Sequence, residues 1–386
     1  MKNPGLIWFT LSIGALISLL CPLASSQTRA AIPSLQFMTD PFPQSVAVGD
    51  FNGDGDLDLA VSVYSFDTAL SDLTILLGNG NGSFKQGPAV GVTGQNVNNA
   101  VVADFNGDGI LDLAISLPDA NEIQVLLGNG DGSFMPLSPV SAEAIFVIAT
   151  GDFNNDGKPD LALVNPGAES VTILLGNGDG TFTKKSTIPI SGAPTAIAIG
   201  DLNLDGKLDL AVVNGSTESV TILLGKGNGT FTKLASQPAT GVEPLSIAIG
   251  DFNGDGHPDL AVSNQNDGYP NPGTVTVLLG NGNGAFRSTS VSPQTGSIPD
   301  TILVADFNGD GKPDLLTSNA GSNTISLLLG EGHGAFGKAQ SFSAGADPLG
   351  AALGDFNGEG IPDVAVANNT TASVTVLLMK RPRPLY

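Results

Sequence analysis

The stretch Asp50-Phe51-Asn52-Gly53-Asp54-Gly55-Asp56-Leu57-Asp58-Leu59 recurs, with small variations, seven times along the chain. Successive copies are separated by 48–55 residues. A repeat of this period indicates a stack or ring of similar supersecondary units rather than one continuous sheet. The other six copies begin at Asp104, Asp152, Asp201, Asp251, Asp306 and Asp355.

Each unit also contains four short runs with strand character, which are clearest in the fourth unit. Alternating small and branched residues, bounded by Gly and Asn, predict strands at residues 195–199, 210–213, 219–224 and 231–234. The acidic stretch separates the first two strands, and a Gly-rich hairpin turn at residues 225–229 separates the last two. Four antiparallel strands per unit and seven units predict an all-β fold, a seven-bladed β-propeller.

The two ends of the repeat region complement each other. Six units contain Leu-Leu-Gly-x-Gly-x-Gly-x-Phe, but the last unit stops at residues 377–379 without a fourth strand. A strand-like segment at residues 34–38 precedes the first unit. We expect this N-terminal strand to complete the last blade and close the ring, which removes exposed strand edges, and we expect Phe37 to replace the missing Phe.

The second residue of each acidic stretch is apolar. We expect these side chains to pack between neighbouring blades, since large aromatic residues are usually buried in cores. They are Phe51, Phe105, Phe153, Leu202, Phe252, Phe307 and Phe356.

The acidic stretch has the chemistry of a cation-binding loop. Its pattern, Asp-x-Asn-x-Asp-Gly-x-x-Asp, gathers three carboxylates, which repel each other by roughly 4 kcal/mol per pair at 4 Å and an effective dielectric of 20. Oxygen ligands without His or Cys in the pattern favour a hard ion, and calcium tolerates irregular geometry better than magnesium. The alternative is an Asx-rich turn without metal.

The seven copies predict up to seven Ca²⁺ sites, with side-chain oxygens from positions 1, 3, 5 and 9 and a backbone carbonyl from position 7. Position 12, which is Val61 in the first copy and Leu163 in the third, lies in a predicted strand, so a helical EF-hand is excluded. The predicted ligands are Asp50, Asn52, Asp54, Asp56, Asp58, Asp104, Asn106, Asp108, Ile110, Asp112, Asp152, Asn154, Asp156, Lys158, Asp160, Asp201, Asn203, Asp205, Lys207, Asp209, Asp251, Asn253, Asp255, His257, Asp259, Asp306, Asn308, Asp310, Lys312, Asp314, Asp355, Asn357, Glu359, Ile361 and Asp363.

The units resemble FG-GAP/VCBS repeats, which are similar to the calcium-binding blades of the integrin α-subunit N-terminal β-propeller. The stretch Ile249-Gly250-Asp251-Phe252-Asn253-Gly254-Asp255-Gly256-His257-Pro258-Asp259 shows the pattern, and the resemblance covers residues 33–379. It implies calcium in the loop between the first two strands of each blade. Departures from the usual residues include Glu359 in the place of Asp at position 5 of the last loop and Leu204 in the place of Gly at position 4 of the fourth.

The N-terminus predicts export. Lys2 precedes an apolar run at residues 6–20, and small residues at 24–26 follow, which is typical of a signal peptide over residues 1–26. The run is too short for a membrane anchor, so we expect a secreted protein without stable membrane insertion and one propeller domain over residues 27–386. Trp8 and Cys21 both lie in this signal, so the mature chain has no disulfide.

The composition and the motifs limit the classes of function and partner that fit this chain. Fifteen Lys and Arg against 37 Asp and Glu give a net charge of −22, which disfavours nucleic acid as a partner. We predict a non-catalytic binding or adhesion module for a protein or carbohydrate ligand, bound on the face opposite the calcium loops. Tyr64 and Tyr269, on two long loops of that face, are candidate contacts.

Two alternatives remain: a calcium-dependent lectin and a polysaccharide-active enzyme. The low aromatic content of 6% makes the lectin alternative less favourable, because sugar-binding sites commonly use aromatic side chains for stacking. His257 and His333, the only histidines, have no catalytic partner in a recognisable motif, and the Asp pairs repeat in every unit as a catalytic pair would not.

Overall fold

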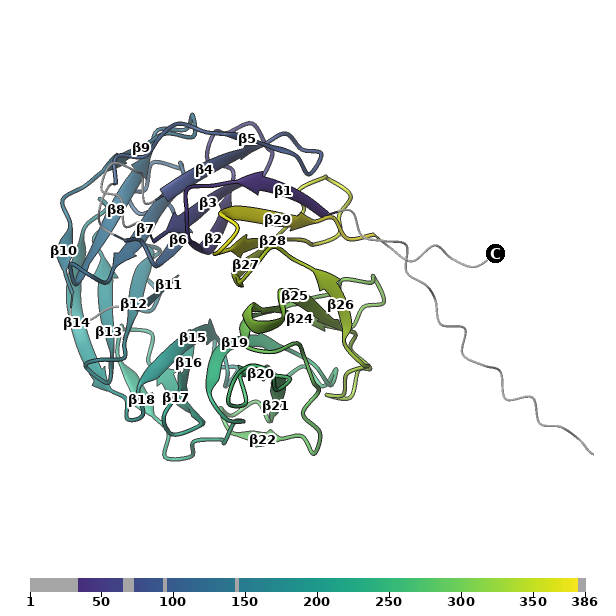
Figure 1. Ribbon diagram of the computed structural model, residues 1–386. Coiled ribbons are helices and arrows are strands. Elements are labelled where there is room, and N and C mark those ends of the chain that lie inside the picture. The colour runs from purple at the N-terminus through teal and green to yellow at the C-terminus, as the bar shows by residue number, and fades with distance from the viewer. Residues whose placement is uncertain (1–33, 65–72, 93–95, 143–145, 381–386) are drawn as a thin grey trace, which may run out of the picture. The chain divides into compact units, whose positions relative to one another are not determined.

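The structure is a computed structural model that describes residues 34–64, 73–92, 96–142 and 146–380; the predicted signal peptide lies outside these ranges. Residues 34–380 form seven antiparallel sheets arranged in a ring, each with its first strand nearest the centre (Figure 1). The all-β, seven-bladed prediction is therefore confirmed. Among the described residues the one short helix is the 3₁₀ turn η1 (Ala320–Ser322), and none is long and apolar enough to span a bilayer.

The strands follow one another blade by blade in chain order. The first four blades contain β2 (Pro43–Gly49), β3 (Asp58–Val63), β4 (Leu73–Gly78) and β5 (Phe84–Gln86); β6 (Asn99–Ala103), β7 (Asp112–Leu117), β8 (Glu122–Gly128), β9 (Phe134–Pro136) and β10 (Val140–Ser141); β11 (Val147–Gly151), β12 (Asp160–Asn165), β13 (Ser170–Gly176) and β14 (Phe182–Pro189); β15 (Pro194–Gly200), β16 (Asp209–Asn214), β17 (Ser219–Gly225) and β18 (Phe231–Lys233). The other three contain β19 (Pro244–Gly250), β20 (Asp259–Asn264), β21 (Thr274–Gly280) and β22 (Phe286–Ser288); β23 (Pro299–Ala305), β24 (Asp314–Asn319), β25 (Thr324–Leu328) and β26 (Gln340–Ser343); β27 (Pro348–Gly354), β28 (Asp363–Asn368), β29 (Ser373–Leu377) and β1 (Ser34–Met38).

The core lies between blades, because each second strand is buried on both of its faces. In β16, Leu210 and Val212 pack toward the third blade, whereas Ala211 and Val213 pack toward the fifth. This alternation follows the two-residue period of a strand. Seven buried clusters of this kind join the seven pairs of neighbouring blades.

The apolar residues at position 2 of the acidic loops pack between blades, as predicted. Phe51 meets Phe134 of the next blade edge to face, with ring centroids 5.5 Å apart. Leu202, which replaces Phe at position 2 of the fourth loop, packs with Phe286 of the fifth blade.

The N-terminal strand closes the ring, as predicted, but Phe37 does not take the place of the missing Phe. In the other blades this Phe pairs with the residue that ends the third strand, as Phe84 does with Gly78. Strand β1 pairs with β29 farther from that end, where Phe37 faces Val374 and contacts Phe84. Met379 and Ile361 instead pack beside Phe307 of the sixth blade.

Candidate metal centre

All seven acidic loops connect the first strand of a blade to its second, so they lie at one end of the ring. The Gly at position 6 has a positive φ of 73–89° in every loop, a backbone conformation that glycine adopts without strain. Leu204 at position 4 of the fourth loop is also left-handed, with φ 59°, and its side chain is 51% exposed.

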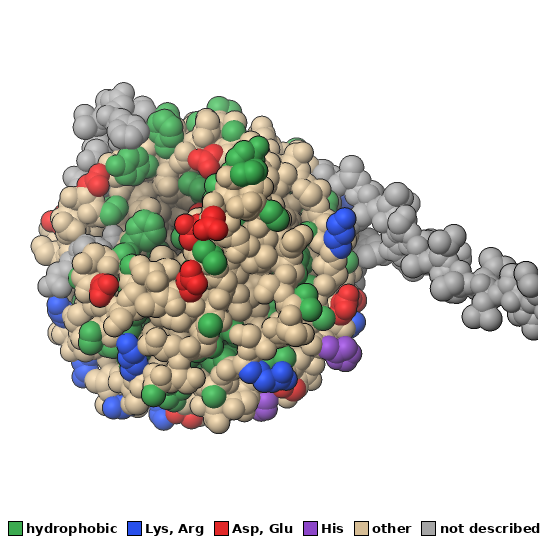
Figure 2. Space-filling view, turned by 60° about the horizontal axis from the view of Figure 1, so that its bottom comes forward, with side chains coloured by type: hydrophobic (Ala, Val, Ile, Leu, Met, Phe, Trp, Pro, Cys, Tyr) green, Lys and Arg blue, Asp and Glu red, His purple; other side chains and the backbone are tan. Residues whose placement is uncertain are grey.

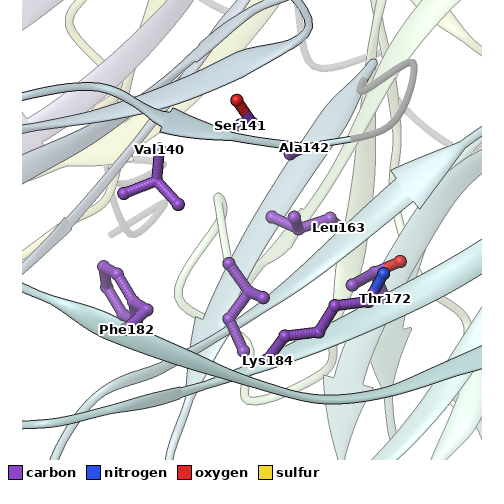
Figure 3. A pocket seen from close by; sticks show the side chains of 8 residues that line it. Val140, Ser141, Ala142, Leu163, Thr172, Phe182 and Lys184 are labelled. Carbon is purple, nitrogen blue, oxygen red and sulfur yellow. The ribbon is translucent and has the colours of Figure 1, made fainter.

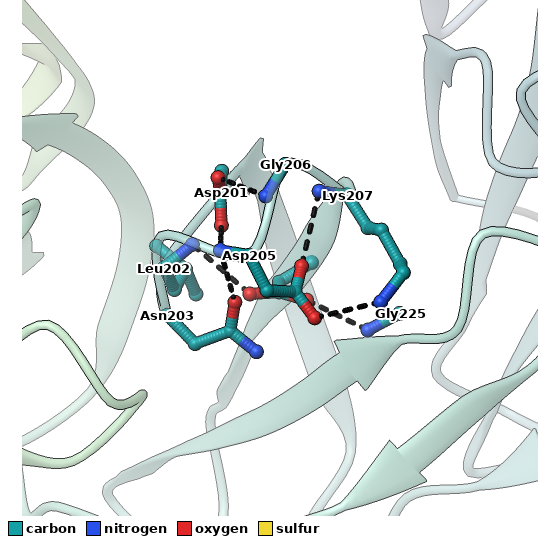
Figure 4. A network of polar contacts seen from close by, with 8 residues as sticks. Asp201, Leu202, Asn203, Asp205, Gly206, Lys207 and Gly225 are labelled. Carbon is teal, nitrogen blue, oxygen red and sulfur yellow. Dashed lines mark hydrogen bonds and ion pairs between the residues drawn. The ribbon is translucent and has the colours of Figure 1, made fainter.

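The first three polar side chains of the first six loops fold back onto the amides of the same loop, as Figure 4 shows for the fourth, and in the seventh loop the first two do so. Asp201 accepts hydrogen bonds from the N–H groups of Asp205 and Gly206 at 3.0 and 2.7 Å. Asn203 also accepts one from Asp205, at 3.0 Å. These are the bonds of an Asx-rich turn, and they place the oxygens of positions 1, 3 and 5 at the surface of one compact loop.

The position 9 carboxylate is fully buried and joins the loop to the third strand of the blade. Asp209 accepts hydrogen bonds from the N–H of Leu202 at 3.0 Å and from that of Gly225, at the end of β17, at 2.7 Å. The same pair of bonds recurs in the other six blades, at 2.7–3.1 Å. The sequence marked these residues as ligands and gave no sign of this second role.

Among the described contacts, every acidic loop except the sixth is also bound to the next blade. The N–H of Gly229, in the Gly-rich hairpin of the fourth blade, donates to the carbonyl of Phe153, position 2 of the third loop, at 2.8 Å. Equivalent bonds of 2.7–3.2 Å join the hairpins of the first, second, third, fifth and sixth blades to the loop of the preceding blade. A change in the conformation of such a loop therefore also affects the interface between its blade and the next one.

Among the described contacts, the fourth loop alone has a hydrogen bond or ion pair from its position 7 side chain to a carboxylate of its own loop. Lys158 and Lys312 donate to hairpin carbonyls of their own blades, those of Asn177 and Glu331, at 2.8 and 3.1 Å. Lys207 instead forms an ion pair with Asp205 at 3.0 Å. A cation in the fourth loop therefore competes with this lysine.

The donor set fits a hard divalent cation, although the side chains are turned toward amides. Among the described residues, no group of three or more His, Cys, Asp or Glu is placed so that it could hold a metal ion. An ionised carboxylate has about four lone-pair sites, and the described hydrogen bonds to Asp201 leave some of them free. Burial raises the pKa of Asp209, and the charges of Asp205 and Asp201 raise it further by a smaller amount, as repulsion between carboxylates of one loop would.

The seventh loop differs at position 5. In the first six loops the N–H at position 7 donates to the position 5 carboxylate at 2.8–3.0 Å. Among the described contacts no such bond joins the N–H of Ile361 to the carboxylate of Glu359, whose side chain is one methylene longer than that of Asp. Calcium binding by this loop stays a prediction.

Without a bound cation, stability should fall as the pH rises from about 4 to about 6. Burial raises the pKa of Asp209, Asp259, Asp314 and Asp363 from 3.8 to about 6. A carboxyl with a raised folded-state pKa binds its proton more tightly in the folded state, so its contribution is present below pH 3.8 and is lost through pH 6. Exposed carboxyls with a lowered pKa, such as Asp131 and Asp179, change the stability mainly below pH 4.

Urea unfolding in calcium-free buffer between pH 4.5 and 7.5 measures this dependence. The expected free energy of unfolding is higher at pH 4.5 than at pH 6.5. Added calcium should recover, above pH 6, the stability that is lost without it. A free energy that rises steadily over the same range would contradict the prediction.

The face opposite the acidic loops carries the two candidate tyrosines, of which Tyr269 is 71% exposed and Tyr64 is partly buried. Most of the long loop that follows Tyr64 lies outside the described residues. His257 belongs to the fifth acidic loop and His333 to the hairpin of the sixth blade, so neither histidine lies on this face.

A cavity of about 250 Å³ lies between the second and third blades (Figure 3). Val140 and Ser141 of β10 line one side, and Leu163, Leu174 and Phe182 of the third blade line the other. None of the described residues that line it is acidic, so it offers no pair of carboxyls for glycoside hydrolysis.

The sequence matches family models over most of the ring. The FG-GAP-like repeat model matches residues 152–212, 201–262, 266–317 and 306–366, which together cover more than half of the 386 residues. The FG-GAP repeat model matches residues 42–83. No curated protein matched the sequence.

Solved structures share the ring at low sequence identity. Virginiamycin B lyase from Staphylococcus aureus has a TM-score of 0.60 and 13% identity, over 90% of this chain and 100% of that one. A protein from Lactobacillus plantarum has a TM-score of 0.61 and 14% identity, over 79% and 86%. BBS1N, solved in complex with ARL6DN, has a TM-score of 0.62 and 12% identity, over 92% and 98%. At these identities the likeness concerns the fold alone.

Proposed function

Because this chain belongs to the family of FG-GAP-like repeat proteins, we propose that it is a secreted, calcium-loaded propeller that binds a protein or glycan without catalysis. The calcium ligands are the side-chain oxygens of positions 1, 3, 5 and 9 and the backbone carbonyl of position 7. When bound, the ion neutralises the carboxylates of the loop. The ligand binds on the opposite face.

The observation that supports this function is the link between each loop and its surroundings. Position 9 ties each loop to the third strand of its blade, and among the described contacts position 2 ties every loop but the sixth to the next blade. Neutralising the loop charge therefore stabilises blade interfaces around the ring, and a rigid ring presents its other face in a constant shape. A sevenfold repeated carboxylate set fits this structural role better than one catalytic centre.

Calcium removal is expected to lower the melting temperature by an amount on the order of 10 °C. Calcium at ten times its dissociation constant adds about 1.4 kcal/mol per site, and several sites act together. Thermal melts of the mature chain with calcium, with chelator and with magnesium measure the effect, and metal analysis gives the stoichiometry. Purified protein without bound calcium, and with the same melt after chelation, would contradict the calcium part of the function.

A further inference from the structure

The face opposite the acidic loops carries only negative charge among its described residues. We call it the distal face; it comprises the connections from fourth to first strands and from second to third strands, with the first two residues of each first strand. It contains no described Lys, Arg or His. Its charged residues are Asp40, Asp119, Glu169, Glu218, Glu243, Asp267, Asp300 and Asp347.

The described basic residues all lie elsewhere, on the acidic loops, the Gly-rich hairpins, the fourth strands and the segments beside them. Figure 2 shows acidic and hydrophobic side chains near the middle of the molecule, whereas most Lys, Arg and His side chains lie toward its edge and lower part. A face of one sign attracts ligands of the other and excludes like charges.

A cavity of about 260 Å³ lies where the distal face meets the axis of the ring. All seven blades line it, each through residues at or beside the start of its first strand. Those strands run from this cavity to the acidic loops, so the cavity and the loops lie at opposite ends of the ring. Residues that line it include Gln44, Asn98, Phe146, Leu245, Asp300 and Leu349.

Asp300 is the one charged residue among those that line the cavity. Its carboxylate accepts a hydrogen bond of 3.3 Å from the hydroxyl of Thr301, and no described cation pairs with it. Burial, with a smaller contribution from the charge of Asp347, raises the pKa of Asp300 to about 6. At neutral pH the cavity therefore holds a half-buried carboxylate that has lost part of its hydration without gaining a described counter-ion.

We propose that this cavity binds an organic cation, an ammonium or guanidinium group on an apolar stem, with Asp300 as its counter-ion. This inference rests on the proposed function, since it names the ligand chemistry of the distal face. Leu245 and Leu349, from the blades on either side of Asp300, contact the stem, and Phe146 adds an aromatic wall. Gln44 and Asn98 supply amide oxygens as acceptors for remaining N–H donors.

The lining favours an organic cation over a metal ion. Calcium takes six to eight oxygen ligands, usually with several carboxylates. Here one carboxylate stands beside leucine side chains, which cannot coordinate a metal. The organic cation comes either from a free amine or from a lysine or arginine side chain of a bound protein.

Calorimetric titration of the mature, calcium-loaded chain with n-butylammonium tests the site, with n-butanol as the uncharged match. The expected result is binding of one butylammonium per chain, no binding of butanol, and affinity reduced roughly tenfold or more in Asp300→Asn. Asp300→Asn should melt no lower than the wild type, because it removes a half-buried charge that no described cation pairs with. Glu169→Gln, which removes one charge from the same face outside the cavity, is the matched control.

The outcomes separate the possibilities. Equal loss in Asp300→Asn and Glu169→Gln, absence of binding, or one-for-one displacement of butylammonium by calcium at the cavity would overturn the proposal. A peptide with a single lysine that binds more tightly than butylammonium identifies a protein side chain as the source, and the reverse identifies a free amine. Repeating the titration after chelation keeps this test separate from the calcium function, since the loops lie at the other end of the ring.

Discussion

Replacing Asp209 by Ala should lower the free energy of unfolding by about 4 kcal/mol without calcium, and by more with calcium. The substitution leaves the N–H groups of Leu202 and Gly225 without an acceptor, and both bonds are buried. Each unsatisfied buried donor costs about 1–3 kcal/mol, and the loop and the third strand lose their connection.

Asp205→Ala is the matched control within the same loop. Asp205 is exposed, and its ion pair with Lys207 at the surface contributes less than about 1 kcal/mol. Denaturant unfolding in chelator should therefore show a large loss for Asp209→Ala and a small one for Asp205→Ala. In calcium both variants should lose part of the stabilisation by the ion. Equal stability of the two variants in chelator would mean that position 9 acts only through a metal.

A chain that begins at Thr39, without β1, should lose about 5 kcal/mol of stability and associate in solution. Strand β1 pairs with β29 over five residues, and a hydrogen bond contributes about 1 kcal/mol. Its removal exposes the edge of β29, whose residues are all buried, and it removes the contact between Phe37 and Phe84. An uncovered apolar strand edge pairs readily with another copy.

A chain that begins at Ser34 keeps β1 and serves as the control. Light scattering after gel filtration should show a monomer for the longer chain and concentration-dependent oligomers for the shorter one. Melts at low concentration measure the loss of stability. If the shorter chain stays monomeric and melts at the same temperature as the longer one, closure by β1 contributes little to the stability of the ring.

The strands of the fourth blade show how accurately the local sequence pattern predicts strand bounds. The predicted strand at residues 210–213 is observed as β16, Asp209–Asn214, and the other three strands agree within one residue at most ends. Strand character depends on alternation and turn residues a few positions apart, which the sequence displays directly. Closure also followed from the sequence, because a missing strand at one end matched a spare strand at the other.

The register of β1 did not follow from the sequence. Phe37 was predicted to replace the missing Phe, yet it pairs with Val374 and leaves the place beside Phe307 to Met379 and Ile361. Register depends on which side chains fit the neighbouring blade, and several registers of a short apolar strand keep the same alternation. Phe51, Phe105 and Phe153 were predicted correctly to pack between blades because they recur in each unit, and the structure adds their ring partners in the next blade.

The amino-acid sequence alone was enough to predict the number of blades, the strands within them and the closure of the ring, and it shows which side chains of each loop carry oxygen. Those features depend on residues that are near in the chain or repeated along it. Only the tertiary structure decided that Asp209 holds the end of β17, that Lys207 pairs with Asp205, and that Asp300 stands in a cavity made by seven strands. These contacts join residues through the packing of blades and the direction of individual side chains, and nothing in the local pattern records either one.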